Sequence, residues 1–101
     1  MEPVNKAELV HRVAISAEVD HENALNVVHA LLEEVQAAVE RGEKVTLVGF
    51  GTFEGRHRAA REARNPRTGE KIEVDATVAP VFKASVPFKK RVADAAAKRA
   101  A

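Results

Sequence analysis

The side chains best suited to bind a ligand are six cationic residues within one segment of sixteen. Residues 56–71 carry a surplus of four positive charges (6 − 2), since Glu62 and Glu70 oppose Arg56, Arg58, Arg61, Arg64, Arg67 and Lys71. The two halves of the chain also differ: residues 1–50 contain four Lys/Arg and nine Asp/Glu, and residues 51–101 contain twelve and six. So dense a cationic block predicts a polyanionic ligand, although charge alone leaves a simple solvated face as the alternative.

Turn-forming residues interrupt this cationic segment. Asn65, Pro66 and Gly69 follow the residue preferences of a tight turn, in which proline presets one dihedral and glycine accepts a positive one. The preceding residues 58–64 have high helix propensity, but they are too short and too poor in apolar residues for a stable helix. We therefore favour a hairpin over about 55–76, which has almost nothing to bury and should project from the body.

Other chemistries find little support in the sequence. The chain has no cysteine, which excludes disulfides, thiolate metal sites and thiol nucleophiles. His29 and Glu33 lie one helical turn apart, as metal ligands can, but no third ligand is suitably spaced, and His11, His21 and His57 are expected at the surface. No Ser/His/Asp set or phosphate loop is present. We therefore expect no enzyme activity, no cofactor and no metal.

Size and composition limit the architecture. The 101 residues are 46% hydrophobic and 31% charged, with Phe as the only aromatic type, which predicts one small domain with a mainly aliphatic core. No apolar stretch approaches 18 residues, and the N-terminus lacks a signal-peptide pattern. The sequence thus predicts a soluble cytoplasmic protein without a membrane partner.

Periodicity predicts two helices in residues 1–42. Asn5 and Glu8 have the spacing of a reciprocal cap for a helix over about 6–16. Asp20 can cap a second helix, which Gly42 ends. Its apolar stripe is wide enough to be buried on more than one side and contains Ala24, Leu25, Val27, Val28, Leu31, Leu32, Val35, Ala38 and Val39.

From Lys44 onward the apolar period changes to two, which predicts strands. A first strand begins near Val45, a turn or bulge follows at residues 49–51, and a second strand begins at Thr52. We predict a third strand over 71–78 and a final helix with Pro87 in its first turn. The expected fold class is α+β: a helical hairpin at 1–42, a three-stranded antiparallel sheet with the arm at 43–83, and a helix and tail at 84–101.

These motifs resemble the bacterial histone-like DNA-binding family that includes HU and integration host factor, and within it HU most closely. The stretch 48–54 is similar to the family's Gly-Phe-Gly-x-Phe signature, and 59–69 is similar to its arm tip. The resemblance covers about residues 5–92. It implies an intertwined homodimer with helices below, a saddle of strands above, and two β-arms that reach around duplex DNA in the minor groove. The same resemblance is compatible with a heterodimer of related subunits and with RNA as a second ligand.

A dimer also follows from the residues themselves, because so small a chain with a two-sided aliphatic helix has too little to bury alone. We expect Phe50, Phe53 and Phe82 in the shared core. Their alternative role, as DNA contacts, is less favoured because Phe flanked by apolar residues usually packs.

The predicted DNA contacts lie mainly on the arm. Arginine suits phosphate binding without sequence preference, and a twisted ribbon could bring both of its faces near the DNA backbone; we assign this role to Arg56, Arg58, Arg61, Arg64, Arg67 and Lys71. The resemblance implies that Pro66 inserts between base pairs as a wedge and that Lys6 and Lys83 contact phosphate from the body. We expect Asn65 to set the tip and to reach a base edge of the DNA.

One stretch departs from the family pattern. Where the family commonly has Lys-Pro-Gly before the last helix, this chain has Lys83, Ala84 and Ser85, followed by Val86 at an often basic position. The body contacts are therefore in question. We predict a nucleoid-associated protein that bends and compacts DNA largely without sequence specificity, in preference to a site-specific bending factor or a protein-interaction module that uses the acidic helices.

Overall fold

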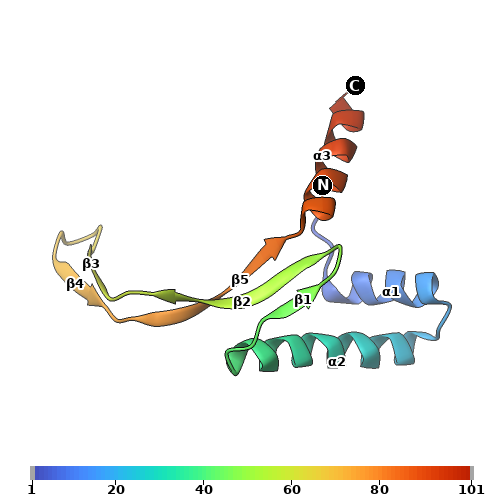
Figure 1. The fold of residues 1–101 in the computed structure, drawn as a ribbon, viewed down its shortest axis with the longest axis horizontal. Helices are drawn as coiled ribbons and strands as arrows, with labels where there is room; N and C mark the ends of the chain where they lie inside the picture. Colours follow the sequence, from blue (N-terminus) through green and yellow to red (C-terminus); the bar gives the residue numbers. More distant parts are fainter. Residues whose placement is uncertain (1, 101) are drawn as a thin grey trace. The chain divides into compact units, whose positions relative to one another are not determined.

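The computed structural model describes residues 2–100, which divide into two compact units with the boundary in the chain between Ala37 and Ala38. In chain order the elements are α1 (Lys6–Ala17), α2 (His21–Glu40), β1 (Val45–Leu47), β2 (Gly51–Arg58), β3 (Arg61–Arg64), β4 (Lys71–Val74), β5 (Thr77–Ala84) and α3 (Val86–Ala100) (Figure 1). The predicted order of helical hairpin, sheet with arm, and final helix is present.

The first unit is a pair of helices side by side, α1 and the larger part of α2 (Figure 1). Its core consists of four small or branched apolar side chains, with Val13 and Leu25 packed against them: Val10, Ala14, Ala24 and Val28. Other members of the predicted stripe stay outside this core, since Val27 is 65% exposed and Leu31 is 53% exposed. Within one chain, only part of the apolar stripe is therefore covered.

The cap of α1 is half of the predicted reciprocal pair. The backbone N–H of Glu8 donates to Asn5 Oδ1 at 2.9 Å, as expected for an N-cap. The carboxylate of Glu8, however, accepts from Arg12 Nε at 3.1 Å instead of returning to the cap residue. The prediction was wrong on this half because an arginine one turn further along the helix offers a charged donor.

The second unit contains an antiparallel sheet of order β1-β2-β5. Gly51 lies opposite Ala84 so closely that a β-carbon there would stand 2.5 Å from both Lys83 O and Phe82 Cζ. This close approach explains the glycine after Phe50, and Gly49, with φ of 81°, makes the turn between β1 and β2. The N–H of Ser85, the residue just before α3, donates to Phe50 O in the turn between β1 and β2 at 2.9 Å.

All four phenylalanines gather in this second unit. Phe53 and Phe82, opposite each other on β2 and β5, have ring centroids 4.7 Å apart. Phe50 stacks on Phe88 of α3 at 5.3 Å and lies 5.2 Å from Phe82. Phe50 and Phe82 nevertheless remain 44% and 40% exposed, so the cluster has apolar surface that the single chain does not cover.

The predicted third strand was wrong in its extent. Instead of one strand over 71–78, the structure has β4, a break at residues 75–76, and β5, which continues to Ala84. Asp75 and Ala76 have low strand propensity and stand outside both ladders. Pro80 is accommodated because β5 is an edge strand, where the absence of one backbone donor is tolerated.

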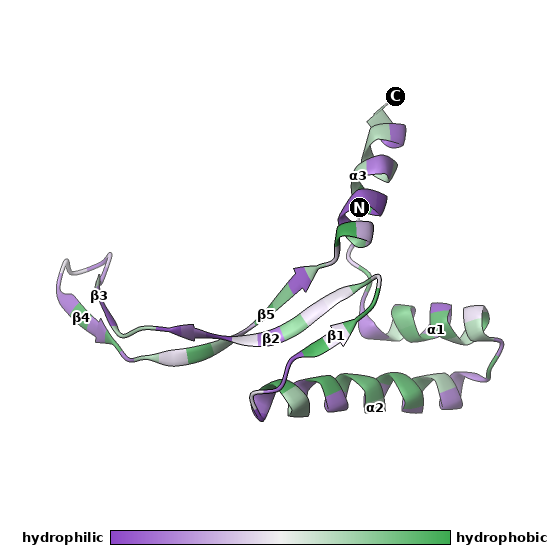
Figure 2. Cartoon of the chain, in the orientation of Figure 1, coloured by the Kyte–Doolittle hydropathy of each residue, from purple (hydrophilic) through white to green (hydrophobic). Residues whose placement is uncertain are grey.

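The arm is a second, two-stranded ladder of β3 and β4, separate from the sheet. The sheet pairing ends at Arg58 opposite Thr77, and the arm pairing resumes at Arg61 opposite Val74. Residues 58–64, which have high helix propensity, are therefore extended, as the hairpin prediction required. Figure 2 shows that hydrophilic residues predominate along much of this projection, and none of residues 56–76 is buried.

Candidate nucleic-acid interface

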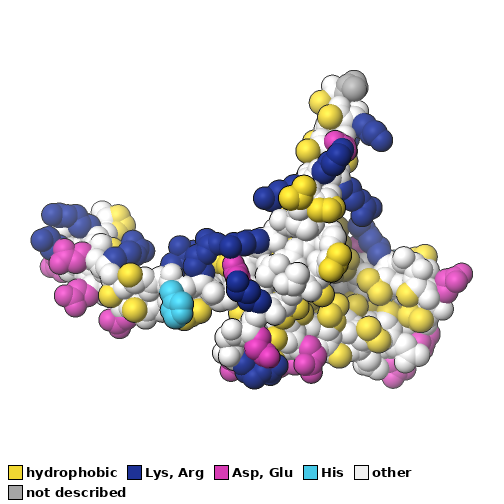
Figure 3. All heavy atoms as spheres, viewed as in Figure 1, with side chains coloured by type: hydrophobic (Ala, Val, Ile, Leu, Met, Phe, Trp, Pro, Cys, Tyr) yellow, Lys and Arg dark blue, Asp and Glu magenta, His cyan; other side chains and the backbone are white. Residues whose placement is uncertain are grey.

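The arm positions its cations by strand alternation. Arg61 and Arg64 are three residues apart in β3, so they lie on opposite faces of the ribbon. Arg64 is opposite Lys71, and Arg67 lies in the turn at the tip. Arg56 and Arg58 extend the series back into β2. All five arginines and Lys71 are exposed, and Figure 3 shows Lys and Arg side chains along the arm.

The tip is built by Asn65. Its side-chain Oδ1 accepts from Arg67 N–H at 2.9 Å, and its backbone carbonyl accepts from Gly69 N–H at 2.8 Å. Asn65 N–H donates to Glu70 O at 2.9 Å, and Gly69 has φ of 73°, as the turn prediction required. Pro66 follows Asn65 in this turn and is exposed at the end of the arm.

The sheet presents a polar face with a different composition. Thr52, Glu54, Arg56 and Arg58 alternate along β2, and register places Lys83 opposite Thr52. Thr52 Oγ1 and Thr46 Oγ1 are 3.3 Å apart on the same face. The alternate positions, including Phe53 and Phe82, form the apolar face described above.

Glu54 is paired with two lysines on this polar face. Its carboxylate lies 2.9 Å from Lys83 Nζ and 3.4 Å from Lys44 Nζ. The hydrogen bond from Lys83 is the main reason that the pKa of Glu54 falls below its usual value; burial opposes the shift, and Lys44 adds to it. The predicted body contact Lys83 is thus engaged by a carboxylate within the chain.

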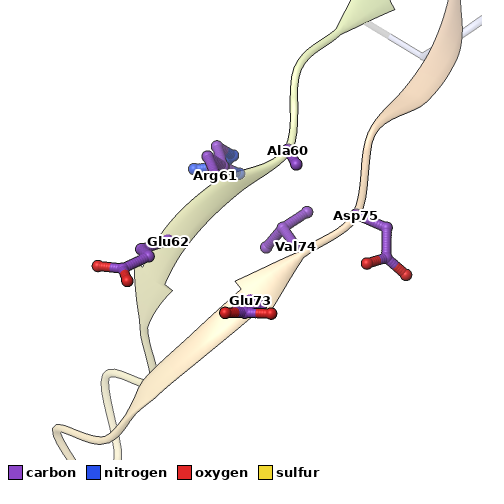
Figure 4. A pocket seen from close by; sticks show the side chains of 6 residues that line it. All are labelled: Ala60, Arg61, Glu62, Glu73, Val74 and Asp75. Carbon is purple, nitrogen blue, oxygen red and sulfur yellow. The ribbon is translucent and has the colours of Figure 1, made fainter.

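Carboxylates also lie along the arm. Glu62 stands directly opposite Glu73, and both line a shallow hollow with Ala60, Arg61, Val74 and Asp75 (Figure 4). With three carboxylates and one guanidinium, this hollow does not favour phosphate. Over residues 55–76 the surplus of positive charge is only two (6 − 4), smaller than the segment 56–71 alone indicated.

The structure brings most of the predicted site residues into one unit. Arg61, Arg64, Asn65, Pro66, Arg67 and Lys71 lie on the arm, and Arg56, Arg58 and Lys83 lie on the sheet strands from which the arm extends. Lys6 belongs to the helical unit, where it is exposed at the start of α1.

Sequence reasoning overlooked Lys44 and Glu54 as site residues, and Phe88 as part of the aromatic cluster. Little in the sequence indicated a role for Glu54. Its two partners, Lys44 and Lys83, are 39 residues apart in the chain and reach Glu54 only through the register of the strands. Phe88 was placed correctly on the final helix, but the contact with Phe50 depends on where that helix docks.

Other kinds of site are not evident in the described part of the chain. Residues 2–100 contain no group of three His, Asp or Glu side chains arranged to hold a metal ion. Over the same range, none of the helices combines the length and the apolar character needed to cross a membrane.

Comparison with known proteins gives consistent matches. A family model described as bacterial DNA-binding protein matches residues 4–93. DNA-binding protein HU from Clostridium pasteurianum is 54% identical over 89 residues, covering 88% of this chain and 98% of the relative. The HU protein of Nostoc sp. is 52% identical over 90 residues, with 89% and 96% covered.

Solved structures agree with these relatives. The Anabaena HU–DNA cocrystal structure matches with a TM-score of 0.84 and 53% identity, covering 88% of this chain and 97% of that one. The structure of HU from Thermotoga maritima matches with a TM-score of 0.61 and 30% identity, with 87% and 97% covered. The α+β fold class predicted from the sequence is thereby confirmed.

Proposed function

The chain belongs to the bacterial DNA-binding protein family, and from this membership we propose that it is an HU-type histone-like protein that binds duplex DNA. The proposal is that it binds largely without sequence specificity through the minor groove, bends the duplex and so compacts it in the bacterial nucleoid. The observation that carries the proposal is the arm, on which exposed cations lead to an exposed proline at the tip. Membership of this family also agrees with the prediction that the chain is not an enzyme.

The cations on the arm would supply most of the affinity. Phosphate contacts need reach and charge more than a fixed geometry, and exposed arginines meet both needs. We assign phosphate contact to Arg56, Arg58, Arg61, Arg64, Arg67 and Lys71, with Lys6 and Lys83 as contacts from the body. Minor-groove edges distinguish base pairs poorly, which is consistent with weak sequence preference.

Pro66 would act as the wedge. An apolar ring inserted at a base step unstacks it at a cost of a few kcal/mol, which the additional phosphate contacts of a bent duplex offset. Asn65 would support this role by fixing the turn, because its Oδ1 already accepts from Arg67 N–H.

The functional form would be a homodimer. The helical unit buries only four residues as its core, while Val27, Leu31, Phe50 and Phe82 all keep much of their surface exposed. A second copy of the chain would cover such surface and supply a second arm. Phe50, Phe53 and Phe82 would then lie in the shared core. Sedimentation equilibrium at micromolar concentration should give twice the chain mass without DNA, and a folded monomer would contradict the dimer.

The test of DNA binding is a titration of random, nicked and pre-bent duplexes at several salt concentrations. If two arms neutralise roughly six to ten phosphates, log affinity should fall with log salt at a slope of about −5 to −9. Nicked and pre-bent duplexes should bind more tightly, because part of the bending cost is already met. A slope near zero, or equal affinity for all three duplexes, would contradict the proposal. An RNA duplex in parallel shows whether RNA is a second ligand.

A further inference from the structure

One carboxylate on the polar face of the sheet is enclosed by its own cations. Glu54 Oε1 is 2.9 Å from Lys83 Nζ, and Oε2 is 3.4 Å from Lys44 Nζ. The side chain of Glu54 is only 12% exposed, whereas those of Lys83 and Lys44 are 58% and 72% exposed. The carboxylate is therefore shielded, while both ammonium groups remain open to an anion from solution.

Strand register brings the three side chains together. Thr52 is opposite Lys83 in the β2–β5 pair, so Glu54 lies diagonally across from that lysine on the same face. In the β1–β2 pair Val45 is opposite Phe53, which places Lys44 level with Glu54 from the other side. A single carboxylate in the central strand thus forms ion pairs with a lysine of β5 and with the lysine just before β1.

Resting on the DNA-binding function proposed above, we propose that Glu54 restrains DNA binding by the sheet, because its carboxylate occupies Lys44 and Lys83 in the place of a phosphate. A DNA phosphate that reaches either lysine must compete with this internal anion. The proposal also adds Lys44 to the surface that DNA contacts.

Counterion exchange explains how the restraint works. A free lysine that binds phosphate releases a cation from DNA, which favours binding at low salt. When the lysine is taken from Glu54 instead, the freed carboxylate attracts a cation from solution and offsets that release. A glutamate carboxylate is already ionised at neutral pH, and the pKa of Glu54 lies below its usual value, so the competition is present under ordinary conditions. Lys44 and Lys83 should therefore add less affinity and less salt dependence than cations without such a partner.

The test is the variant Glu54→Gln, which removes the charge and nearly keeps the shape. At about 50 mM salt the variant should bind a random duplex roughly three- to tenfold more tightly, with a salt slope steeper by about one to two per subunit. The matched control is Glu43→Gln, which makes the same change of charge next to Lys44, on a carboxylate that pairs with Arg41 at 2.8 Å. This control should change affinity less than twofold, and an equal gain in both variants would overturn the proposal.

A double-mutant cycle shows whether Glu54 acts through the lysine. In a Lys83→Gln background, Glu54→Gln should gain half or less of its effect on affinity, since one of the two restrained cations is absent. An unchanged gain would overturn the proposal, as would parent-like affinity and slope in Glu54→Gln itself.

Two further measurements keep the outcomes distinct. If circular dichroism shows that Glu54→Gln does not fold, the variant Lys44→Gln replaces it as the test. Lys44→Gln should flatten the salt slope by less than half as much as Arg58→Ala does. An equal flattening in the two variants would overturn the proposal. Absence of duplex binding by the parent chain would instead contradict the proposed function, whatever the variants do.

Discussion

The sheet and the arm are built from the same β-hairpin segment, yet they use their cations differently. On the sheet, Lys44 and Lys83 pair with Glu54 above a cluster of four phenylalanines. None of the five arginines between residues 56 and 67, two at the end of β2 and three on the arm, forms an ion pair with another residue in the range 2–100, and none of residues 56–76 is buried. We therefore expect substitutions on the sheet to lower folding stability, and substitutions on the arm to lower DNA affinity.

The largest expected effect is a loss of stability caused by a substitution in the sheet. Gly51→Val should lower the free energy of unfolding by roughly 3 kcal/mol, because its β-carbon would overlap the backbone of Lys83 and the ring of Phe82. Urea denaturation followed by circular dichroism measures this cost. The matched change on the arm is Gly69→Ala. A β-carbon there has no neighbouring atom within 4 Å, so the only cost to stability is the positive φ of residue 69. The free energy of unfolding of Gly69→Ala should stay within about 1 kcal/mol of that of the parent. Equal losses of stability in Gly51→Val and Gly69→Ala would mean that the arm and the sheet unfold as one unit.

The second prediction concerns a loss of DNA affinity that leaves folding stability unchanged. Arg64→Ala should weaken duplex binding about tenfold at low salt, a loss of roughly 1.4 kcal/mol. The salt slope should flatten by about one unit per arm, while the urea midpoint stays unchanged. Arg12→Ala is the control, since Arg12 is an exposed arginine of the helical unit that pairs with Glu8 at 3.1 Å. If Arg12→Ala flattens the slope equally, the arm has no special role.

A third variant separates the shape of the arm from its charge. Pro66→Ala should leave the salt slope nearly unchanged, because no charge is lost, and should reduce the bend of a short duplex with dyes at its ends. The preference for nicked over intact DNA should fall at the same time. Energy transfer between the dyes reports the bend, and Thr68→Ala at the same tip serves as the control. A parent-like bend in Pro66→Ala would reduce Pro66 to a turn residue.

The smallest effect tests the ion pairs of the sheet by pH. Since the folded-state pKa of Glu54 lies below its usual value of 4.5, this carboxylate stabilises the fold above that value and loses the contribution as pH falls through the lowered pKa. The stability of the parent relative to Glu54→Gln should therefore be greatest near neutral pH and decline in acid. Thermal melts of both proteins between pH 3 and 7, about the range in which carboxyl groups titrate, measure the difference. A difference that does not vary with pH would exclude a role for ionisation.

Much of the fold was predictable because its signals are local. Asn5 caps its helix with a side-chain oxygen, as its position indicated, and Gly49 and Gly51 marked a close turn. The tip was equally local, since Asn65 forms its bonds within five residues. The arm was recognisable because nothing in it could be buried.

Features that depend on pairing between distant residues were not predictable in the same way. The limits of the third strand depend on Pro80 lying at a sheet edge, opposite Gly55. The Glu54 pairs depend on the register of three strands. Counting charges along the chain therefore overestimated the free cations of the site, because it could not assign Lys83 to a carboxylate 29 residues away.

The break between the two ladders affects how readily proteases cleave the protein. Residues 59–60 and 75–76 belong to neither ladder, and Arg58 directly precedes an exposed alanine pair. Exposed, unpaired backbone after arginine is what trypsin-like enzymes cleave, so we expect a cut in the free protein at this break. Duplex DNA seated on the arm would cover the same bond and slow the cut. The lifetime of each molecule would then depend on whether it is occupied, with unbound copies degraded before bound ones.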